Sequence, residues 1–182
     1  DWSSDVCSSD LGGRAIFGMG RGLSRREFSQ FGIAMDESSE RFDEASPLIL
    51  EALETGVFPE HNGKFYRQPQ APLRPEPLSK EWRKTRVTQV AMSPDSAEQA
   101  AKLGVQMMAF NYKAPEAQKK ELDDYKALFT KLHGYEPRPP LLTEMSIVDT
   151  DAKRARENAE RYVAGYCASV LHHYEMQIGR AH

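Results

Sequence analysis

Cysteine and long apolar runs are both scarce in this sequence, and each scarcity excludes a class of protein. Only two of the 182 residues are cysteines, Cys7 and Cys167, too few for a disulfide framework or a cysteine-based metal cluster. No apolar run approaches the ~18 residues that a membrane-spanning helix requires. The chain begins with polar and acidic residues, whereas a secretory signal has a basic start and an apolar block. We therefore expect a cytoplasmic protein with no membrane segment.

An excess of charge of one sign is also lacking. The 24 Lys and Arg residues nearly balance the 27 Asp and Glu residues, which gives a formal net charge of -3. A nucleic-acid-binding protein usually carries a clustered basic surplus, so we expect no nucleic-acid partner. With 40% hydrophobic residues, the composition suits one soluble globular domain of ordinary size.

The two ends of the chain resemble translated sequencing adapter. Residues 1–11 match the conceptual translation of a common short-read adapter, and residues 177–182 match the reverse complement of the same oligonucleotide. The alternative is a disordered tail rich in Ser and Asp. We therefore place one domain at 12–176 and adapter-derived tails at 1–11 and 177–182. We expect these tails to be exposed and to make few contacts with the interior.

Four short apolar runs bounded by turn residues predict β-strands. They lie at 15–19, 87–92, 106–110 and 141–148, and their lengths and flanking residues suit buried strands. No hairpin signal joins one run to the next, and helical patterns fill the spaces between them. This alternation predicts an α/β fold with a parallel sheet and crossover helices, either an open sheet or part of a barrel.

Helix start signals accompany the strands. Ser93 and Pro94 form an N-cap and first-turn pair, Pro115 opens the next helix, and Asp151 caps a long final helix. Glycines at the ends of the helical patterns are typical of helix C-termini. Each predicted strand after the first is thus followed by a predicted helix.

The stretch between the first two predicted strands contains a helix and a long loop. The helix runs from a cap at Asp36 to Gly56 and has Pro47 inside it. Because proline removes one backbone hydrogen bond, we expect Pro47 to kink this helix or to break it into two. Residues 57–85 are rich in proline and polar groups, which predicts an excursion loop.

Two segments that follow predicted strands suit an anion. In the glycine-rich stretch 18–22 the backbone permits close approach of a ligand, and Arg21 offers a forked cation for phosphate. At the start of the next helix, free N–H groups join the hydroxyls of Ser93 and Ser96. The plain alternatives are a simple turn at 18–22 and a helix cap at Ser93. Both segments lie where α/β folds place their ligands.

Several motifs follow one another in order between residues 12 and 176. They are GRAIFGMGRGL at 13–23, MDES at 35–38, GKFY at 63–66, LRPEP at 73–77 and VAMSPDS at 90–96. In sequence and order they resemble the bacterial-luciferase-like, flavin-dependent monooxygenases, where they cover about the fourth to seventh strands of the barrel. The resemblance implies a partial (β/α)8 TIM barrel, with 12–176 as an internal fragment of it.

The same resemblance implies an enzyme that uses reduced flavin mononucleotide (FMN) and O2 to oxygenate a small organic substrate. Some relatives use the deazaflavin coenzyme F420 instead. Carried over by position, Arg21, Ser93 and Ser96 would hold the flavin phosphate. Gly20 and Met92 would lie near the ring system and the ribityl chain.

The resemblance also indicates what this stretch lacks. Relatives often have a further phosphate-binding arginine where this sequence has Ser39. Their catalytic histidine and much of their subunit interface belong to the first three strands, so we name no catalytic residue here. We expect the fragment alone to be inactive. For the whole protein the resemblance implies a dimer and a flavin reductase that supplies reduced flavin.

Two other classes of function stay open. The anion sites also suit a phosphate-binding barrel of the aldolase or isomerase type, and some luciferase relatives are non-catalytic flavin-binding proteins. The histidines at 172 and 173 are adjacent, and adjacent residues on a helix point in different directions. We therefore expect no metal site there.

Overall fold

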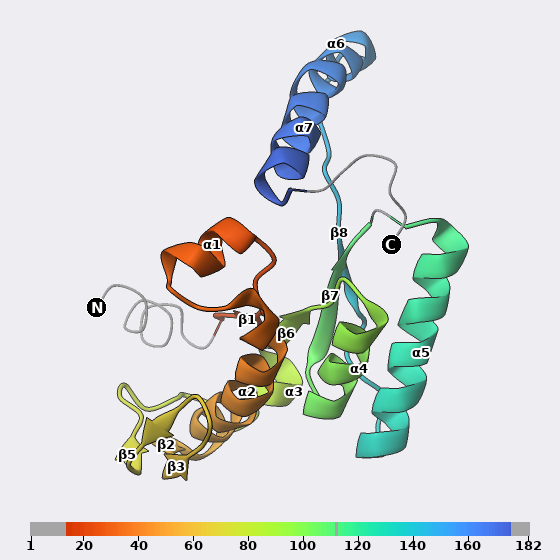
Figure 1. Ribbon diagram of the computed structural model, residues 1–182. Helices are drawn as coiled ribbons and strands as arrows, with labels where there is room; N and C mark the ends of the chain where they lie inside the picture. Colours follow the sequence, from red (N-terminus) through yellow and green to blue (C-terminus); the bar gives the residue numbers. More distant parts are fainter. Residues whose placement is uncertain (1–13, 112, 176–182) are drawn as a thin grey trace. The chain divides into compact units, whose positions relative to one another are not determined.

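The computed structural model describes residues 14–111 and 113–175 (Figure 1). The tails expected at 1–11 and 177–182 lie outside these residues. The contacts within the chain define two compact units. The first comprises the chain up to Gly20 together with Ser39–Thr143, and the second comprises Arg21–Ser38 together with the chain from Glu144 onward.

A parallel sheet organises the first unit, and its strands follow one another as β1, β6, β7 and β8 (Figure 1). Each strand pairs in parallel with its neighbour. The parallel α/β fold is therefore confirmed. The bounds of the strands are β1 (Phe17–Met19), β6 (Val87–Val90), β7 (Gln106–Phe110) and β8 (Leu141–Thr143).

The last predicted strand is shorter than its apolar run. We expected a strand at 141–148, but β8 ends at Thr143. Its partner β7 ends at Phe110, and the last backbone bond between the two segments runs from the N–H of Asn111 to the carbonyl of Thr143 at 3.0 Å. The apolar residues after Thr143 lie beyond the end of β7 and have no residue of that strand to pair with. An apolar pattern alone therefore does not extend the sheet.

Helices α4 (Pro94–Leu103) and α5 (Pro115–His133) make the crossovers and pack against each other. Both begin with proline in the first turn. N–H groups in the first turn make no hydrogen bond within the helix, so proline, which lacks one, is tolerated there. Both end at a glycine with positive φ, 71° at Gly104 and 75° at Gly134, a conformation that favours glycine. The predicted starts at Ser93 and Pro115 are confirmed.

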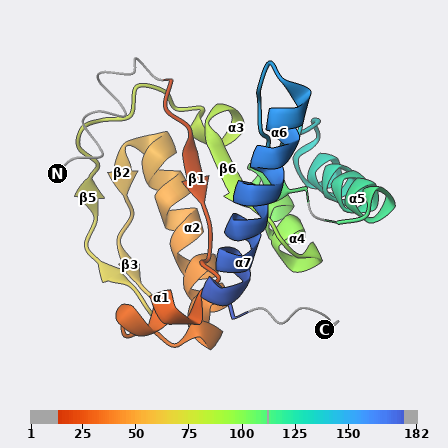
Figure 2. The same ribbon diagram turned by 90° about the horizontal axis from the view of Figure 1, so that it is seen from above.

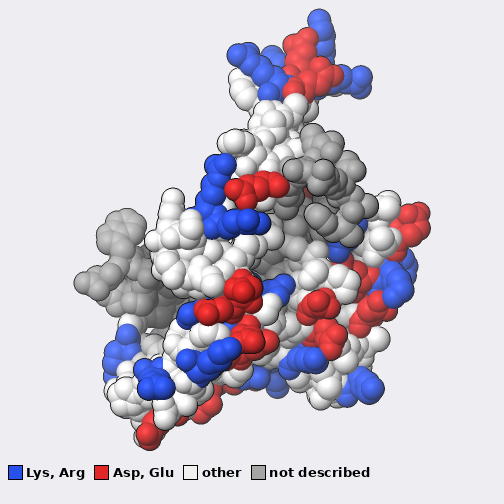
Figure 3. Space-filling view, viewed as in Figure 1, with Lys and Arg blue, Asp and Glu red and all other residues white. Residues whose placement is uncertain are grey.

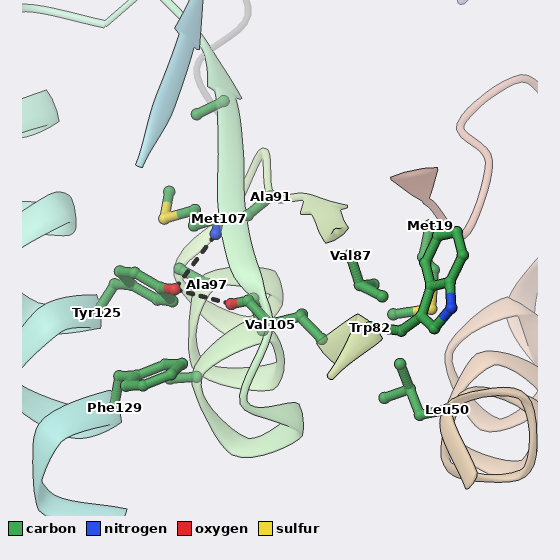
Figure 4. Packing of buried hydrophobic residues seen from close by; sticks show 13 residues of the cluster. Met19, Leu50, Trp82, Val87, Ala91, Ala97, Val105, Met107, Tyr125 and Phe129 are labelled. Atoms are coloured by element: carbon green, nitrogen blue, oxygen red, sulfur yellow. Dashed lines mark hydrogen bonds between the residues drawn. The ribbon is translucent and has the colours of Figure 1, made fainter. Parts of the chain in front are cut away.

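The core lies between one face of the sheet and the helices that cover it (Figure 4). Its fully buried members come from α2, α4, β6, β7 and the loop before β7. Among them Leu50, Val87, Val105 and Met107 are each 0% exposed. The hydroxyl of Tyr125 reaches into this layer from α5. It donates to the Val105 carbonyl at 2.7 Å and accepts from the Met107 N–H at 3.3 Å.

The other face of the sheet carries apolar side chains with substantial exposure. Alternation along the strands places Ile16, Phe110 and Leu141 on this face, and they are 55%, 46% and 39% exposed. In a closed parallel barrel this face forms the packed interior. The arrangement is consistent with a partial barrel.

Helix α2 (Ser38–Thr55) is one helix, so of the two outcomes expected at Pro47 the break is wrong, and the kink stays a prediction. Pro47 lies on the exposed side of α2, where water solvates the carbonyl that has lost its partner, while the opposite side packs in the core. The expected cap at Asp36 is also wrong, because Asp36 lies inside a 3-10 turn, η2 (Met35–Glu37). The closing glycine is confirmed: Gly56 follows α2 with φ 79°.

The expected loop at 57–85 is only partly a loop. Within it β2 pairs with β5 and β3 pairs with β4, both antiparallel, which makes an interrupted hairpin beside α2 (Figure 2). Proline at the end of such short strands destabilises them little. At the edge of a sheet its position would face solvent, so no ladder hydrogen bond is lost when the N–H is missing. The elements are β2 (Val57–Phe58), β3 (His61–Asn62), β4 (Arg67–Gln68), β5 (Ala71–Pro72) and a final helix α3 (Trp82–Thr85).

The second unit is mainly helical, and its longest stretch begins at the predicted cap. The Asp151 carboxylate accepts from the N–H groups of Lys153 and Arg154 at 2.8 and 3.1 Å, so this cap is confirmed. The helix predicted after it contains a π-helical turn. The elements of the unit are α1 (Arg25–Gln30), η2, α6 (Ala152–Asn158), the π-helix η3 (Ala159–Val163) and α7 (Ala164–His173). In the described parts of the chain, no helix combines the length and apolarity needed to cross a membrane.

Candidate functional site

The carboxyl ends of β1 and β6 lie side by side and bring four of the predicted cofactor residues into one region. Met19 at the end of β1 is in register with Gln89 of β6. Gly20 follows β1 directly, and Met92, Ser93 and Ser96 follow β6. A Cβ added at the exposed Gly20 would lie 3.9 Å from the Cβ of Val90, so the backbone there is open to close approach. Parallel α/β folds bind ligands at this edge.

Ser93 and Ser96 form a reciprocal capping box at the start of α4. The Ser96 N–H donates to Ser93 Oγ at 3.3 Å, and the Ser93 N–H donates to Ser96 Oγ at 3.1 Å. The two hydroxyl oxygens are 2.7 Å apart. This arrangement satisfies first-turn N–H groups that have no partner within the helix. The cap predicted at Ser93 is therefore confirmed, and the two hydroxyls belong to one cluster.

A subset of the polar groups in this cluster suits an anion. The Ser96 hydroxyl donates to the Ser93 carbonyl at 3.1 Å, which leaves the Ser93 hydroxyl as the donor in the 2.7 Å contact with Ser96 Oγ. A ligand oxygen would replace Ser96 Oγ as the acceptor of that hydrogen. Pro94 has no N–H, and the N–H of Asp95 has no acceptor within an α-helix. One hydroxyl and one backbone N–H at the positive end of the α4 dipole are chemically suited to a phosphate oxygen.

The charges around this helix start act in opposite directions. The exposed Asp95 lies in the first turn of α4. Its carboxylate interacts favourably with the positive end of the helix dipole but repels an anion. A phosphate there requires a cation to offset that repulsion. Arg21 is the predicted cation and belongs to the second unit, whereas Ser93 and Ser96 belong to the first. That all three share one cleft stays a prediction.

The prediction missed one polar residue behind this cluster. Gln89 of β6 is 1% exposed and faces α4, where its Nε2 donates to the Ser96 carbonyl at 3.3 Å. Its Oε1 is buried and has no hydrogen-bond partner in the described residues. A signal was present, because Thr88 and Gln89 interrupt the apolar run of this strand. Strand patterning alone assigns no role to such polar residues.

A separate groove lies between α4 and α5. It has a volume of about 520 Å³, and Ser93 and Ser96 do not line it. Its rim carries ion pairs one helical turn apart, Lys120 with Asp124 on α5 and Lys102 with Glu98 on α4. Figure 3 shows acidic and basic side chains interspersed over this face. Such exposed pairs contribute little to stability. The lining also contains a partly buried ion pair, Lys113 with Glu121.

The histidines near the end of α7 are not gathered with other ligands. His173 Nε2 lies 3.1 Å from the carboxylate of Glu27 on α1, within the second unit. In the described residues no three His, Cys, Asp or Glu side chains are grouped so as to hold a metal ion.

The fold and the site together define a class of protein: a parallel α/β barrel segment with a polar helix start at the carboxyl edge of its sheet. Comparison with known families is more specific. The model of the luciferase-like monooxygenase family matches residues 11–182. This chain belongs to that family.

Individual relatives agree with the family assignment. The chain is 24% identical over 160 residues to the alkanal monooxygenase alpha chain of Aliivibrio fischeri, a match covering 87% of this chain and 44% of that protein. Its structure is similar to monooxygenase RslO1 from Streptomyces bottropensis, with a TM-score of 0.76 and 25% identity over 90% of this chain and 50% of the other. The chain thus spans about half the length of the proteins it matches.

Two more distant structures share the fold. One is the oxygenating constituent of 3,6-diketocamphane monooxygenase of Pseudomonas putida in complex with FMN, with a TM-score of 0.64 and 18% identity over 88% of this chain and 47% of that one. The other is an F420-dependent secondary alcohol dehydrogenase with an F420-acetone adduct, with a TM-score of 0.64 and 18% identity over 86% and 47%.

Proposed function

We propose that the whole protein to which this chain belongs is a monooxygenase that uses reduced FMN and O2 to oxygenate a small organic substrate. The observation that carries the proposal is the paired hydroxyls of Ser93 and Ser96 at the start of α4, beside the open backbone of Gly20 at the end of β1. Membership of the luciferase-like family and the similarity to RslO1 support it.

In this proposal the described residues bind and orient the cofactor. The Ser93 hydroxyl and the Asp95 N–H would donate to the flavin phosphate, and Arg21 would offset its charge. Gly20 and Met92 would lie beside the ring system and the ribityl chain, where glycine leaves space and methionine offers a flexible apolar surface. Bound reduced flavin would supply the electrons for the reaction with O2. The residues that act on the substrate belong to parts of the barrel outside this chain.

The proposal extends to the partners and location of the whole protein. A flavin reductase would deliver reduced FMN, the protein would be a dimer, and it would act in the cytoplasm. Coenzyme F420 is the alternative cofactor, since one structure with the same fold holds F420. FMN is preferred because the structures called monooxygenases include one in complex with FMN.

Oxygen uptake distinguishes these functions. The whole protein would be supplied with FMN, a flavin reductase and NADH, and O2 consumption would be followed with and without candidate organic substrates. We expect substrate-dependent O2 uptake coupled to formation of an oxygenated product. FMN binding without this uptake would indicate a non-catalytic flavin-binding protein, and F420-dependent dehydrogenation would identify the alternative cofactor. Absence of any flavin binding would contradict the proposal and favour a phosphate-binding aldolase or isomerase.

A further inference from the structure

A chain of hydrogen bonds connects α2 and α4 to β6 behind the candidate phosphate site. Gln89 Nε2 on β6 donates to Gln99 Oε1 on α4 at 2.9 Å. Gln99 Nε2 in turn donates to Asp43 Oδ1 on α2. The same Gln89 Nε2 donates to the Ser96 carbonyl in the first turn of α4. Three elements of the first unit are therefore joined through two amide side chains.

The direction of this chain is set at its outer end. An ionised carboxylate only accepts hydrogen bonds, so Asp43 requires the Nε2 of Gln99 to face it. The Oε1 of Gln99 then faces Gln89 and requires a donor there. Gln89 must therefore present its Nε2 to α4, although this leaves its buried Oε1 without a partner in the described residues. The exposed Asp43 thus fixes the orientation of a fully buried amide.

The inner end of the chain reaches the residue that forms the capping box. Ser96 is 4% exposed, and its N–H and hydroxyl are the groups that pair with Ser93. Its carbonyl is the group that Gln89 binds. A shift of this carbonyl therefore moves the first turn of α4 and the Ser93 hydroxyl with it.

We propose that Gln89, oriented by Gln99 and Asp43, is a positioning residue that holds the first turn of α4 in the geometry needed to bind a phosphate group. This inference rests on the proposed function, because it takes the flavin phosphate as the ligand of Ser93 and Ser96. A purely structural role for Gln89 would stabilise the fold without favouring a phosphate-bearing ligand. Comparing FMN with riboflavin, which lacks the phosphate, separates the two roles.

The experiment measures the dissociation constants of FMN and riboflavin by quenching of flavin fluorescence in the whole protein. Replacing Gln89→Leu removes both hydrogen bonds from β6. We expect FMN binding to weaken roughly three- to tenfold, the effect of one net hydrogen bond, while riboflavin binding stays within about twofold of its original value. Asp43→Ala acts at the exposed end of the chain and should shift the same ratio in the same direction, by less.

The matched control is Gln118→Leu on α5. Gln118 is also a buried glutamine, 4% exposed, and its amide atoms have no hydrogen-bond partner in the described residues. The control should leave the FMN-to-riboflavin ratio unchanged. If Gln89→Leu does not fold, Asp43→Ala provides the test by itself.

Each outcome has a defined meaning. Equal affinity of the unmodified protein for FMN and riboflavin would contradict the phosphate site of the proposed function, and with it this inference. A clear preference for FMN that Gln89→Leu and Asp43→Ala leave unchanged would overturn the inference alone. Parallel losses of FMN and riboflavin binding would show a purely structural role and would also overturn it.

Discussion

Glu44 Oε1 on α2 and His61 Nε2 on β3 are joined by a hydrogen bond of 2.9 Å. The same carboxylate accepts from the N–H groups of Phe65 and Tyr66, at 3.0 and 2.9 Å. One side chain of α2 thus holds both sides of the hairpin tip. A Cβ added at Gly63 would lie 2.0 Å from Glu44 Oε1, so only glycine fits beside this carboxylate.

This carboxylate makes the attachment of the hairpin sensitive to acid. Partial burial raises the pKa of Glu44, but the hydrogen bonds from His61, Tyr66 and Phe65 outweigh it and lower the pKa from 4.5 to about 2. A carboxyl whose pKa is lower in the folded state stabilises the fold above its unfolded pKa, and this stabilisation is lost as pH falls through the folded value. The contribution should therefore be complete above pH 4.5 and decline toward pH 2.

Thermal unfolding of the whole protein between pH 6 and pH 2.5 tests this prediction. We expect Glu44→Gln to lower the midpoint at pH 6 and to reduce the fall of the midpoint between pH 4.5 and pH 2.5. Gly63→Ala should act similarly, because the added methyl group displaces the carboxylate from its partners. Identical acid sensitivity of Glu44→Gln and the unmodified protein would show that Glu44 is not the group involved.

A second prediction concerns the buried hydroxyl of Tyr125. Burial raises its pKa to about 12, although the hydrogen bond from the Met107 N–H lowers it, so the hydroxyl stays protonated and donates to Val105 at neutral pH. Tyr125→Phe would leave the Val105 carbonyl and the Met107 N–H without this partner. We expect the free energy of unfolding to fall by about 1–3 kcal/mol. A loss below about 0.3 kcal/mol would mean that water replaces the hydroxyl.

The Ser93 cap offers a variant pair that separates folding from phosphate binding. Asn and Asp cap helices about as well as Ser, so both substitutions should preserve the stability of α4. Ser93→Asp places a negative charge where we expect the phosphate, and Ser93→Asn does not. We expect Ser93→Asp to weaken FMN binding at least about tenfold more than Ser93→Asn. Equal affinities of the two variants for FMN, measured by titration, would argue against a phosphate at this helix start.

Much of the first unit was predictable because its signals are local. The strands at 87–92 and 106–110, and the helix starts at Ser93 and Pro115, follow from apolar runs, N-cap chemistry and proline placement. These signals act within a few residues, so the sequence contains them in full. The parallel order followed from the absence of hairpin signals between the runs.

The features that the sequence did not predict depend on residues that are distant along the chain. The hairpin inside 57–85 is held by Glu44, and the bond between Glu44 and His61 spans 17 positions. Pro47 is tolerated in α2 because the opposite side of the helix packs in the core, which periodicity within α2 does not show. Gln89 has its hydrogen-bond partners on α4, and Gln99 is in turn bound to α2. A sequence pattern does not specify such pairings, so these features became visible only in three dimensions.

A fourth prediction concerns residues 12–176 as a separate polypeptide. The face with Ile16, Phe110 and Leu141 is substantially exposed, and β1 and β8 are the ends of the strand order. Open edges and an uncovered apolar face promote association. We expect this polypeptide to aggregate, to assemble by swapping or to form a molten state, without flavin turnover. A monomer with a cooperative melt and sharp near-UV dichroism would contradict this.

The central claim is that the flavin phosphate binds at the start of α4, and a crystal structure of the whole protein with FMN tests it most directly. We predict phosphate oxygens within about 2.7–3.2 Å of Ser93 Oγ and of the Arg21 guanidinium. The isoalloxazine ring should extend past Gly20. A phosphate bound away from the start of α4, with the Ser93–Ser96 capping box intact and Arg21 directed elsewhere, would contradict the account.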